Sequence, residues 1–257
     1  MWYQIKSYLN FLLKSSNQHG VHSPFVYDLI TNCLYDKNNY PAYQKIKEFR
    51  IDLTQNKDSI EIIDFGAGSR VFKSNQRKVT AIVKNAGIPF KRQKLLYRIT
   101  NYFKPKTILE LGTSLGLGTA AMAFTDYSNE ITTVEGCYNT TEVSKLMFKK
   151  YQLKNIQLQN STFDKFFKKQ PSKLFDMVYI DGAHNKKSTL QNFEYLMNHI
   201  HNGSVLIFDD IYWSPEMTEA WNIIKEHPKV SVSIDTFYWG LVFFRKEQRK
   251  QHFSIRL

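Results

Sequence analysis

The chain has 257 residues, of which 42% are hydrophobic and 15% aromatic, and its formal net charge is +12. This length and composition predict a globular protein with a large apolar core. No run of about 18 apolar residues occurs, so we expect no membrane-spanning helix and no membrane partner. The two cysteines, Cys33 and Cys137, exclude a disulfide framework and favour the reducing cytoplasm as the location.

The positive charge has two interpretations. A basic surface attracts nucleic acid and other polyanions. However, the lysines are scattered along the chain, and the clusters are short, as at Lys91–Lys94 and Arg245–Lys250. We therefore favour an ordinary solvated surface, with a polyanionic partner as the alternative.

Residues 1–95 lack a regular alternation of strands and helices. Apolar residues recur at helical spacing over residues 2–14 and again from Phe25 to Cys33. Ser23 and Pro24 suit the N-cap and the first turn of the second helix. We predict that residues 1–95 form a helical cap, followed by a separate domain over residues 96–257.

Residues 60–65 predict a short strand or an extended segment, and a glycine-containing stretch, Gly66-Ala67-Gly68-Ser69, follows it. This stretch does not fit a cofactor loop, because no strand that ends in an acidic residue follows at the right distance. We interpret Asp64 to Arg70 as a loop or lid over the site. Residues 76–102 are basic and are predicted to be helical.

From about residue 105 strands and helices alternate regularly. Strands are predicted near 107–111, 131–135, 156–159, 175–180, 204–208, 230–235 and 239–245, and helices near 117–127, 139–151, 188–200 and 214–226. Such alternation is typical of a doubly wound, mostly parallel, Rossmann-like sheet with right-handed crossovers. The short connection between the last two strands makes one of them antiparallel. The predicted fold class is therefore α/β, with a seven-stranded sheet.

The most informative stretch of the chain is the acidic strand end and glycine loop from Ile108 to Thr119. An apolar strand carries Glu110 near its end and leads into Gly112 and Gly116 before a helix of small residues begins. Glycine has no Cβ, so the backbone of such a loop can approach a nucleotide-like ligand closely. Glu135 ends the next strand, where a carboxylate can accept hydrogen bonds from a ribose diol.

The glycine spacing distinguishes between cofactors. A dinucleotide-binding loop would have glycine at the position of Ser114, so an NAD-dependent dehydrogenase is the weaker interpretation. The arrangement Glu110-Leu111-Gly112-x-x-x-Gly116 instead resembles motif I of class I S-adenosylmethionine-dependent methyltransferases. The resemblance implies that the cofactor is bound by Glu110, Gly112, Thr113, Ser114, Gly116, Glu135 and Asp181. It also implies that Thr162 and Phe163, which follow the third strand, hold the adenine; simple packing is the alternative.

Three further carboxylates follow neighbouring strands. Asp181 comes after the strand near 175–180, and Asp209 and Asp210 come after the strand near 204–208. Ligands of doubly wound sheets bind beyond the carboxyl ends of the strands. Clustered carboxylates repel one another unless a cation intervenes, and Mg²⁺ is a suitable one. The alternatives are that the aspartates cap turns, or that Asp181 acts without a metal.

The segment from about 105 to 245 resembles the metal-dependent O-methyltransferases, including the catechol, caffeoyl-CoA and macrolide-sugar enzymes. The resemblance implies that Asp181, Asp209 and Asp210 bind Mg²⁺. Catechol enzymes carry a lysine base where this chain has His184, and histidine at this position is similar to the sugar-modifying branch. His184 and Asp181 would then be catalytic, with the imidazole accepting the proton of a metal-bound hydroxyl. A structural hydrogen-bonding role is the alternative for His184.

Together these patterns predict an S-adenosylmethionine-dependent enzyme that methylates a small hydroxylated acceptor with the help of Mg²⁺. An RNA (tRNA) methyltransferase of the same fold is one alternative, although Asp181-Gly182-Ala183-His184 replaces the Asn/Asp-Pro-Pro-aromatic motif of many base-methylating enzymes. A non-catalytic cofactor-binding protein is another, but it would not need three strand-end carboxylates. Aromatic residues of the first helix are candidates for a homodimer contact.

Overall fold

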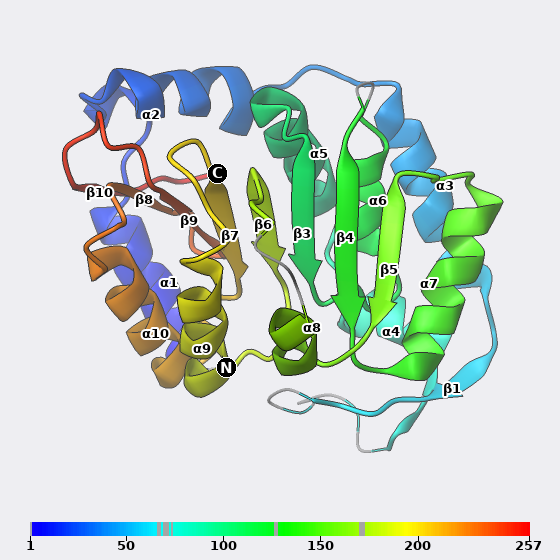
Figure 1. Ribbon diagram of the computed structural model, residues 1–257. Coiled ribbons are helices and arrows are strands. Elements are labelled where there is room, and N and C mark those ends of the chain that lie inside the picture. Colours follow the sequence, from blue (N-terminus) through cyan, green and yellow to red (C-terminus); the bar gives the residue numbers. More distant parts are fainter. Residues whose placement is uncertain (1, 66–67, 69–71, 73, 126–127, 170–172) are drawn as a thin grey trace. The chain divides into compact units, whose positions relative to one another are not determined.

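The computed structural model describes residues 2–65, 68, 72, 74–125, 128–169 and 173–257 (Figure 1). The chain divides into two compact units, Asp36–Lys169 and a discontinuous unit of Met1–Tyr35 with Gln170–Leu257. This division does not coincide with the boundary predicted near residue 95, which stays a prediction. Much of the predicted lid, namely 66–67 and 69–70, lies outside the described residues.

The unit Asp36–Lys169 alternates helices and strands after an initial helix and hairpin. Its elements are α3 (Ala42–Gln55), β1 (Ser59–Glu61), β2 (Gln76–Lys78), α4 (Val79–Asn85), α5 (Phe90–Phe103), β3 (Thr107–Leu111), α6 (Leu117–Ala123), β4 (Glu130–Glu135), α7 (Tyr138–Lys150), β5 (Ile156–Asn160) and α8 (Phe163–Lys169). The sequence did not predict α3 or α8 as separate elements.

Strands β3, β4 and β5 form a parallel sheet in which β4 is central (Figure 1). The register pairs Glu110 with Thr133, and Glu135 with Asn160. Leu109 and Leu111 of β3 have no exposed surface. Burial on both faces explains why β3 is almost continuously apolar, whereas β5 alternates apolar and polar residues and is exposed at every second position or more. The three strands predicted near 107–111, 131–135 and 156–159 are thereby confirmed.

The helix predicted over residues 76–102 is wrong in two respects, its first residues and its continuity. The segment begins as strand β2, and α4 and α5 are separated at 86–89. Pro89 lacks an amide hydrogen and directly precedes α5, which favours a new helix start there. A Cβ at Gly87 would lie 2.6 Å from a methyl carbon of Leu117 and 2.8 Å from the Val83 carbonyl oxygen. This close approach requires glycine at the break.

The second unit combines the N-terminal helices with the C-terminal third of the chain. Its elements are α1 (Trp2–Lys14), a 3₁₀ turn (Gln18–Gly20), α2 (Pro24–Leu29), a π-helical turn (Ile30–Leu34), β6 (Met177–Ile180), α9 (Lys186–Leu196), β7 (Val205–Asp209), α10 (Pro215–Glu226), β8 (Val232–Asp235), β9 (Trp239–Phe243) and β10 (Gln251–Ser254). Ser23 accepts a hydrogen bond from the Val26 amide, which confirms the predicted N-cap.

The strands of this unit follow the order β10-β8-β9-β7-β6. Strand β9 is antiparallel to both β7 and β8, whereas β6 is parallel to β7 and β10 is parallel to β8. The single antiparallel strand agrees with the prediction. Strand β10 was not predicted, because its residues are largely polar and its first two, Gln251 and His252, are exposed at a sheet edge.

The α/β fold class with mostly parallel strands is confirmed, and β10 is an addition to the seven predicted strands. Both cysteines, Cys33 and Cys137, are free and buried. Across the described residues, the helices are too short or too polar to cross a membrane.

Candidate functional site

The loop that follows β3 has a backbone conformation that requires small residues. Gly112 has a φ of 105° and Gly116 a φ of 80°, and Ser114 adopts a φ of 48° without being glycine. A Cβ at Gly116 would lie 2.6 Å from a ring carbon of Phe148 in α7. The amide of Gly112 donates to the Val134 carbonyl across a distance of 2.9 Å. The loop is therefore folded tightly against β4 and α7, and the predicted close approach of its backbone to a ligand stays a prediction.

Glu110 is a buried carboxylic acid beneath this loop, with 1% of its surface exposed. Its Oε2 accepts hydrogen bonds from the hydroxyl of Thr133 at 2.6 Å and from the hydroxyl of Thr119 in α6. The hydroxyls of Thr113 and Thr133 are 2.5 Å apart. Sequence analysis missed Thr119 and Thr133; aligning the two predicted strands would have placed Val134 opposite Glu110, whereas the observed register is shifted by one residue and pairs Glu110 with Thr133. Glu110 thus ties β3, β4 and α6 together.

Burial raises the pKa of Glu110 from 4.5 to about 7, and the charge of Glu135 adds to this, although the two threonine hydrogen bonds oppose it. A carboxyl whose pKa is raised on folding stabilises the protein fully below its unfolded pKa. That contribution is lost as the pH rises toward the folded pKa, because the unfolded chain then releases the proton first. The affected window is therefore pH 4.5 to about 7.

We expect Glu110→Gln to remove this pH dependence. The difference in unfolding free energy between wild type and variant should fall by about 3 kcal/mol from pH 4 to pH 8, which is the pKa shift at about 1.36 kcal/mol per unit. Urea unfolding of both proteins at a series of pH values measures it. A difference that stays constant over this range would show that Glu110 ionises normally in the folded protein.

Glu135, at the end of β4, clamps the glycine loop. Its Oε2 accepts a hydrogen bond from the Ser114 amide and its Oε1 one from the Cys137 amide, each at 2.8 Å. The predicted role was to accept hydrogen bonds from a ribose. Each carboxylate oxygen has more than one acceptor position, so both roles are compatible. Burial raises the pKa of Glu135, and hydrogen bonds to backbone amides oppose this rise.

The segment after β5 lies next to Glu135. The Ser161 amide donates to the Glu135 carbonyl at 3.0 Å. Thr162 accepts a hydrogen bond from the Lys165 amide at 3.4 Å, and Phe163 is the first residue of α8. Thr162 therefore helps to start a helix, and both predicted adenine-binding residues follow the carboxyl end of their strand. Their contact with a cofactor stays a prediction.

The segment predicted as a short strand or extended over residues 60–65 lies beside the end of β4. The Ile63 amide donates to the Cys137 sulfur at 3.5 Å, and the Asn139 side chain donates to the Glu61 carbonyl at 2.8 Å. A Cβ at Gly136 would meet the ring of Phe65 at 2.6 Å. No sequence pattern connects residues so far apart along the chain. Phe65 therefore covers the backbone directly after Glu135.

The second group of predicted residues belongs to the discontinuous unit. Asp181 follows β6, and its carboxylate accepts a hydrogen bond from the Tyr179 hydroxyl at 3.0 Å. The Nε2 atom of His184 lies 3.7 Å from Asp181 Oδ1, close enough for an ion pair when the imidazole is protonated. The His184 ring lies 6.1 Å from that of Trp213. Ala183 and His184 both have positive φ, so a tight turn presents the imidazole.

Asp209 and Asp210 end the neighbouring strand. The parallel register pairs Ile180 with Phe208, so Asp181 and Asp209 follow adjacent strand ends at the same edge. Asp209 is 6% exposed. Asp210 has a φ of 52°, and its carbonyl accepts a hydrogen bond from the Trp213 amide at 2.8 Å. The backbone of Asp210 therefore begins a turn, and the role of its side chain, as a metal ligand or as a turn cap, stays a prediction.

The predicted Mg²⁺ site requires three carboxylates around one point. Within the part of the chain that the structure describes, no three His, Cys, Asp or Glu side chains form a group that could hold a metal ion. Asp181, Asp209 and Asp210 are therefore adjacent in the fold without forming such a cluster. The residues present do not fit the ion in this arrangement, and a role for magnesium stays a prediction.

Tyr212 and Trp213, which follow Asp210, make different contacts. The Tyr212 hydroxyl donates to Asp235 at 2.6 Å, and its ring stacks on Phe237 with centroids 5.1 Å apart. Tyr212 is thereby engaged in packing at the end of β8. Trp213 is the one of the two that lies near His184.

One protein family matches part of the chain. Residues 109–211 match a family model described as a methyltransferase domain. This match runs from β3, through the glycine loop and the Asp181–His184 turn, to the residue after Asp210. No curated protein matches the chain.

Several solved structures share the fold at low sequence identity. The SAH-bound methyltransferase PaMTH1 of Podospora anserina is 14% identical, with a TM-score of 0.60, over 88% of this chain and 97% of that one. The O-methyltransferase TomG of Streptomyces achromogenes, in complex with SAM, is 13% identical, with a TM-score of 0.56, over 86% and 95%. An O-methyltransferase of Bacillus cereus, in complex with SAH, is 14% identical, with a TM-score of 0.54, over 85% and 96%.

These similarities concern the fold and one part of the chain. Residues 109–211 are similar to a methyltransferase domain, the solved structures share the α/β fold, and the predicted resemblance to class I methyltransferases is confirmed.

Proposed function

We propose that this protein transfers a methyl group from S-adenosylmethionine to the hydroxyl oxygen of a small molecule. The observation that carries the proposal is the pair of strand-end arrangements: a glycine loop clamped by Glu135, and a histidine paired with Asp181. Both follow the carboxyl ends of parallel strands, where ligands of such sheets bind. The O-methyltransferases with the same fold, TomG and the Bacillus cereus enzyme, give further support.

The loop region fits the cofactor. The Glu135 carboxylate has acceptor positions beyond those used by Ser114 and Cys137, and the positive φ of Gly112 and Gly116 turns the loop at the carboxyl end of β3. We propose that Glu135 binds the ribose hydroxyls and that Thr162 and Phe163 contact the adenine. Bound S-adenosylmethionine would supply an electrophilic methyl group on a sulfonium, whose departure leaves a neutral thioether.

His184 is proposed as the general base. Its Nε2 would take the proton from the acceptor hydroxyl, because a neutral imidazole has a ring nitrogen that can accept one. The Asp181 carboxylate, 3.7 Å away, would stabilise the imidazolium that results. The Tyr179 hydroxyl keeps Asp181 in place. A protein side chain alone can perform this proton transfer. Assistance by Mg²⁺ is a separate prediction, and comparing activity with EDTA and with excess Mg²⁺ tests it.

Cofactor binding is tested by titrating S-adenosylhomocysteine into the protein calorimetrically. We expect Glu135→Gln to weaken binding about 10- to 100-fold, because the clamp and the ribose contacts both lose a charged acceptor. Glu130→Gln is the matched control, since it makes the same change at the other end of β4, and it should change the affinity less than twofold. Equal affinities for wild type and Glu135→Gln would contradict the assigned cofactor site.

The acceptor class is tested by methyl transfer from labelled S-adenosylmethionine to catechols, sugars and transfer RNA. Transfer to a small hydroxylated molecule is the expected result. Transfer confined to RNA would favour the alternative enzyme, which the net charge of +12 suits. Cofactor binding without transfer to any acceptor would favour a binding protein. Repeating the active assay with EDTA, and then with excess Mg²⁺, determines whether a divalent ion takes part.

A further inference from the structure

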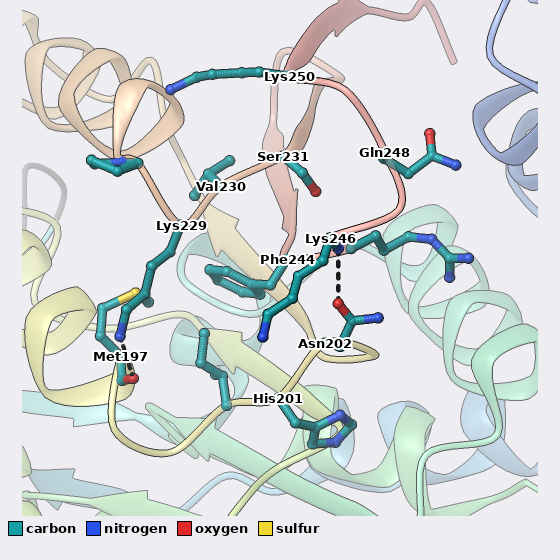
Figure 2. A pocket seen from close by; sticks show the side chains of 13 residues that line it. Met197, His201, Asn202, Lys229, Val230, Ser231, Phe244, Lys246, Gln248 and Lys250 are labelled. Carbon is teal, nitrogen blue, oxygen red and sulfur yellow. Dashed lines mark hydrogen bonds between the residues drawn. The ribbon is translucent and has the colours of Figure 1, made fainter.

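A pocket of about 600 Å³ lies in the discontinuous unit, apart from the residues discussed above (Figure 2). It is lined by the ends of three connections: after α9, after α10 and after β9. Its lining residues are Met197, Ile200, His201, Asn202, Pro228, Lys229, Val230, Ser231, Phe244, Arg245, Lys246, Gln248 and Lys250. Pockets of this volume accommodate small organic ligands.

The pocket and the aspartates lie at opposite ends of the same strands. Val205 pairs with Phe243 at the end of β7 next to the pocket, and Asp209 pairs with Trp239 at the other end. Four residue steps at about 3.3 Å each separate the two ends by roughly 13 Å. A ligand in this pocket would therefore not contact Asp209 or Asp210.

The lining carries positive charge in excess. Four of its residues are cations (Lys229, Arg245, Lys246 and Lys250) and none is a carboxylate. Arg245 and Lys250 pair with acidic residues outside the lining, at 2.8 Å and 3.5 Å. Within the described ranges, the one acceptor of the Lys229 ammonium is the Met197 carbonyl, at 3.2 Å. Among the described residues the Lys246 ammonium has neither a hydrogen bond nor an ion pair.

The two lysines without a carboxylate partner face a common space. Figure 2 shows Lys229 and Lys246 extending on either side of Phe244, with Ser231 close by. Phe244, which lies between the two lysines in Figure 2, is 6% exposed, and Val230 is a second apolar residue of the lining. The Ser231 hydroxyl donates to the Phe243 carbonyl at 3.2 Å, which leaves its oxygen able to accept.

We propose that this pocket binds a small phosphate monoester that carries an aromatic or otherwise apolar group. Two ammonium groups repel each other in a concave site, and a dianion between them removes that repulsion. A phosphate monoester carries nearly two negative charges above its second pKa of about 6. Its three oxygens can accept from both lysines, and its apolar group fits against Phe244 and Val230.

The test is calorimetric titration at pH 8 and low salt, with phenyl phosphate, inorganic phosphate and benzamide as probes. We expect phenyl phosphate to bind more tightly than inorganic phosphate, and neutral benzamide not to bind measurably. Lys229→Ala/Lys246→Ala should weaken phenyl phosphate binding about 100-fold, at about tenfold for each charge-assisted hydrogen bond. Both side chains are exposed, so the variant should fold; Lys246→Ala alone, with an expected tenfold loss, provides a second test.

The matched control is Lys47→Ala/Lys145→Ala, which removes the same charge from exposed positions on α3 and α7. This control should bind phenyl phosphate within about twofold of wild type. Unchanged affinity in the pocket variant would overturn the proposal, and so would an equal loss in both double variants, which would show a general charge effect. Equal affinity for phenyl phosphate and inorganic phosphate would overturn the assignment of an apolar group.

Discussion

Replacing His184 with alanine is expected to lower kcat for methyl transfer about 10²- to 10⁴-fold, the usual contribution of a positioned general base. The affinity for S-adenosylhomocysteine should not change, because the cofactor residues assigned to the loop, Glu135 and the segment after β5 keep their contacts. Turnover and calorimetric affinity measured on the same preparation check both parts. The free energy of unfolding should change little, since His184 lies in a turn and is partly exposed.

His252→Ala is the matched control for this prediction. His252 also pairs with a carboxylate, Glu226 at 3.2 Å, but it lies in the edge strand β10. Its replacement should leave kcat within about twofold of wild type. If His184→Ala retained full turnover, or if it lost cofactor affinity in proportion to activity, the imidazole would have a structural role instead.

The second large effect is expected from Gly116→Ala, which should destabilise the protein by about 2–4 kcal/mol and abolish cofactor binding. A Cβ would lie 2.6 Å from the Phe148 ring and 3.4 Å from Ser144 Cβ, so the loop or α7 must shift. The φ of 80° adds the cost of a left-handed conformation, about 1 kcal/mol for a residue with a side chain. Overpacking of this kind typically costs a further 1–3 kcal/mol. Urea unfolding measures the sum.

Gly68→Ala separates the two costs. Gly68 has a similar φ of 76°, but nothing lies within 4 Å of an added Cβ, so this variant bears the backbone cost alone. It should lose about 1 kcal/mol or less. Placing Gly116→Ala in a Phe148→Ala background should also reduce its cost, because the clashing ring is gone. Equal losses for Gly116→Ala and Gly68→Ala would show that the contact with Phe148 is relieved without strain.

The order of elements in the second half of the chain could be predicted because most of its strands, β6 to β9 among them, are buried along their whole length. Continuous apolar runs such as those ending at Glu110 and Ile180 separate clearly from the amphipathic helices between them. Strand β10 and helix α8 lack this contrast. Gln251 to Ser254 are mostly polar, and Phe163 to Lys169 form a single short helix with two buried phenylalanines, Phe166 and Phe167. Their structure depends on neighbours rather than on their own pattern.

The sequence predicted several candidate site residues but not the contacts that they make. Motif spacing predicted the glycine loop and Glu135, and the strand ends predicted Asp181 and His184. The spacing could not show that Glu135 would clamp the amide of Ser114, since that contact joins the ends of two strands. The spacing also could not show that the backbone of Asp210 has a left-handed conformation. Because Asp181, Asp209 and Asp210 follow adjacent strands, the sequence predicted that they bind one metal ion. Among the described side chains, these three do not form a group that could hold one.

The alternation of strands and helices, the glycine loop and the acidic residues at strand ends can be predicted from the amino-acid sequence. They depend on local hydrophobicity, on the missing Cβ of glycine and on short spacings. The partners of each of these residues are visible only in the folded structure. The Thr119 and Thr133 hydroxyls on Glu110, Phe65 over Gly136 and the lysine-lined pocket at the far end of β7 all join segments distant in the chain. Such contacts depend on register and packing, for which a single sequence contains no local signal.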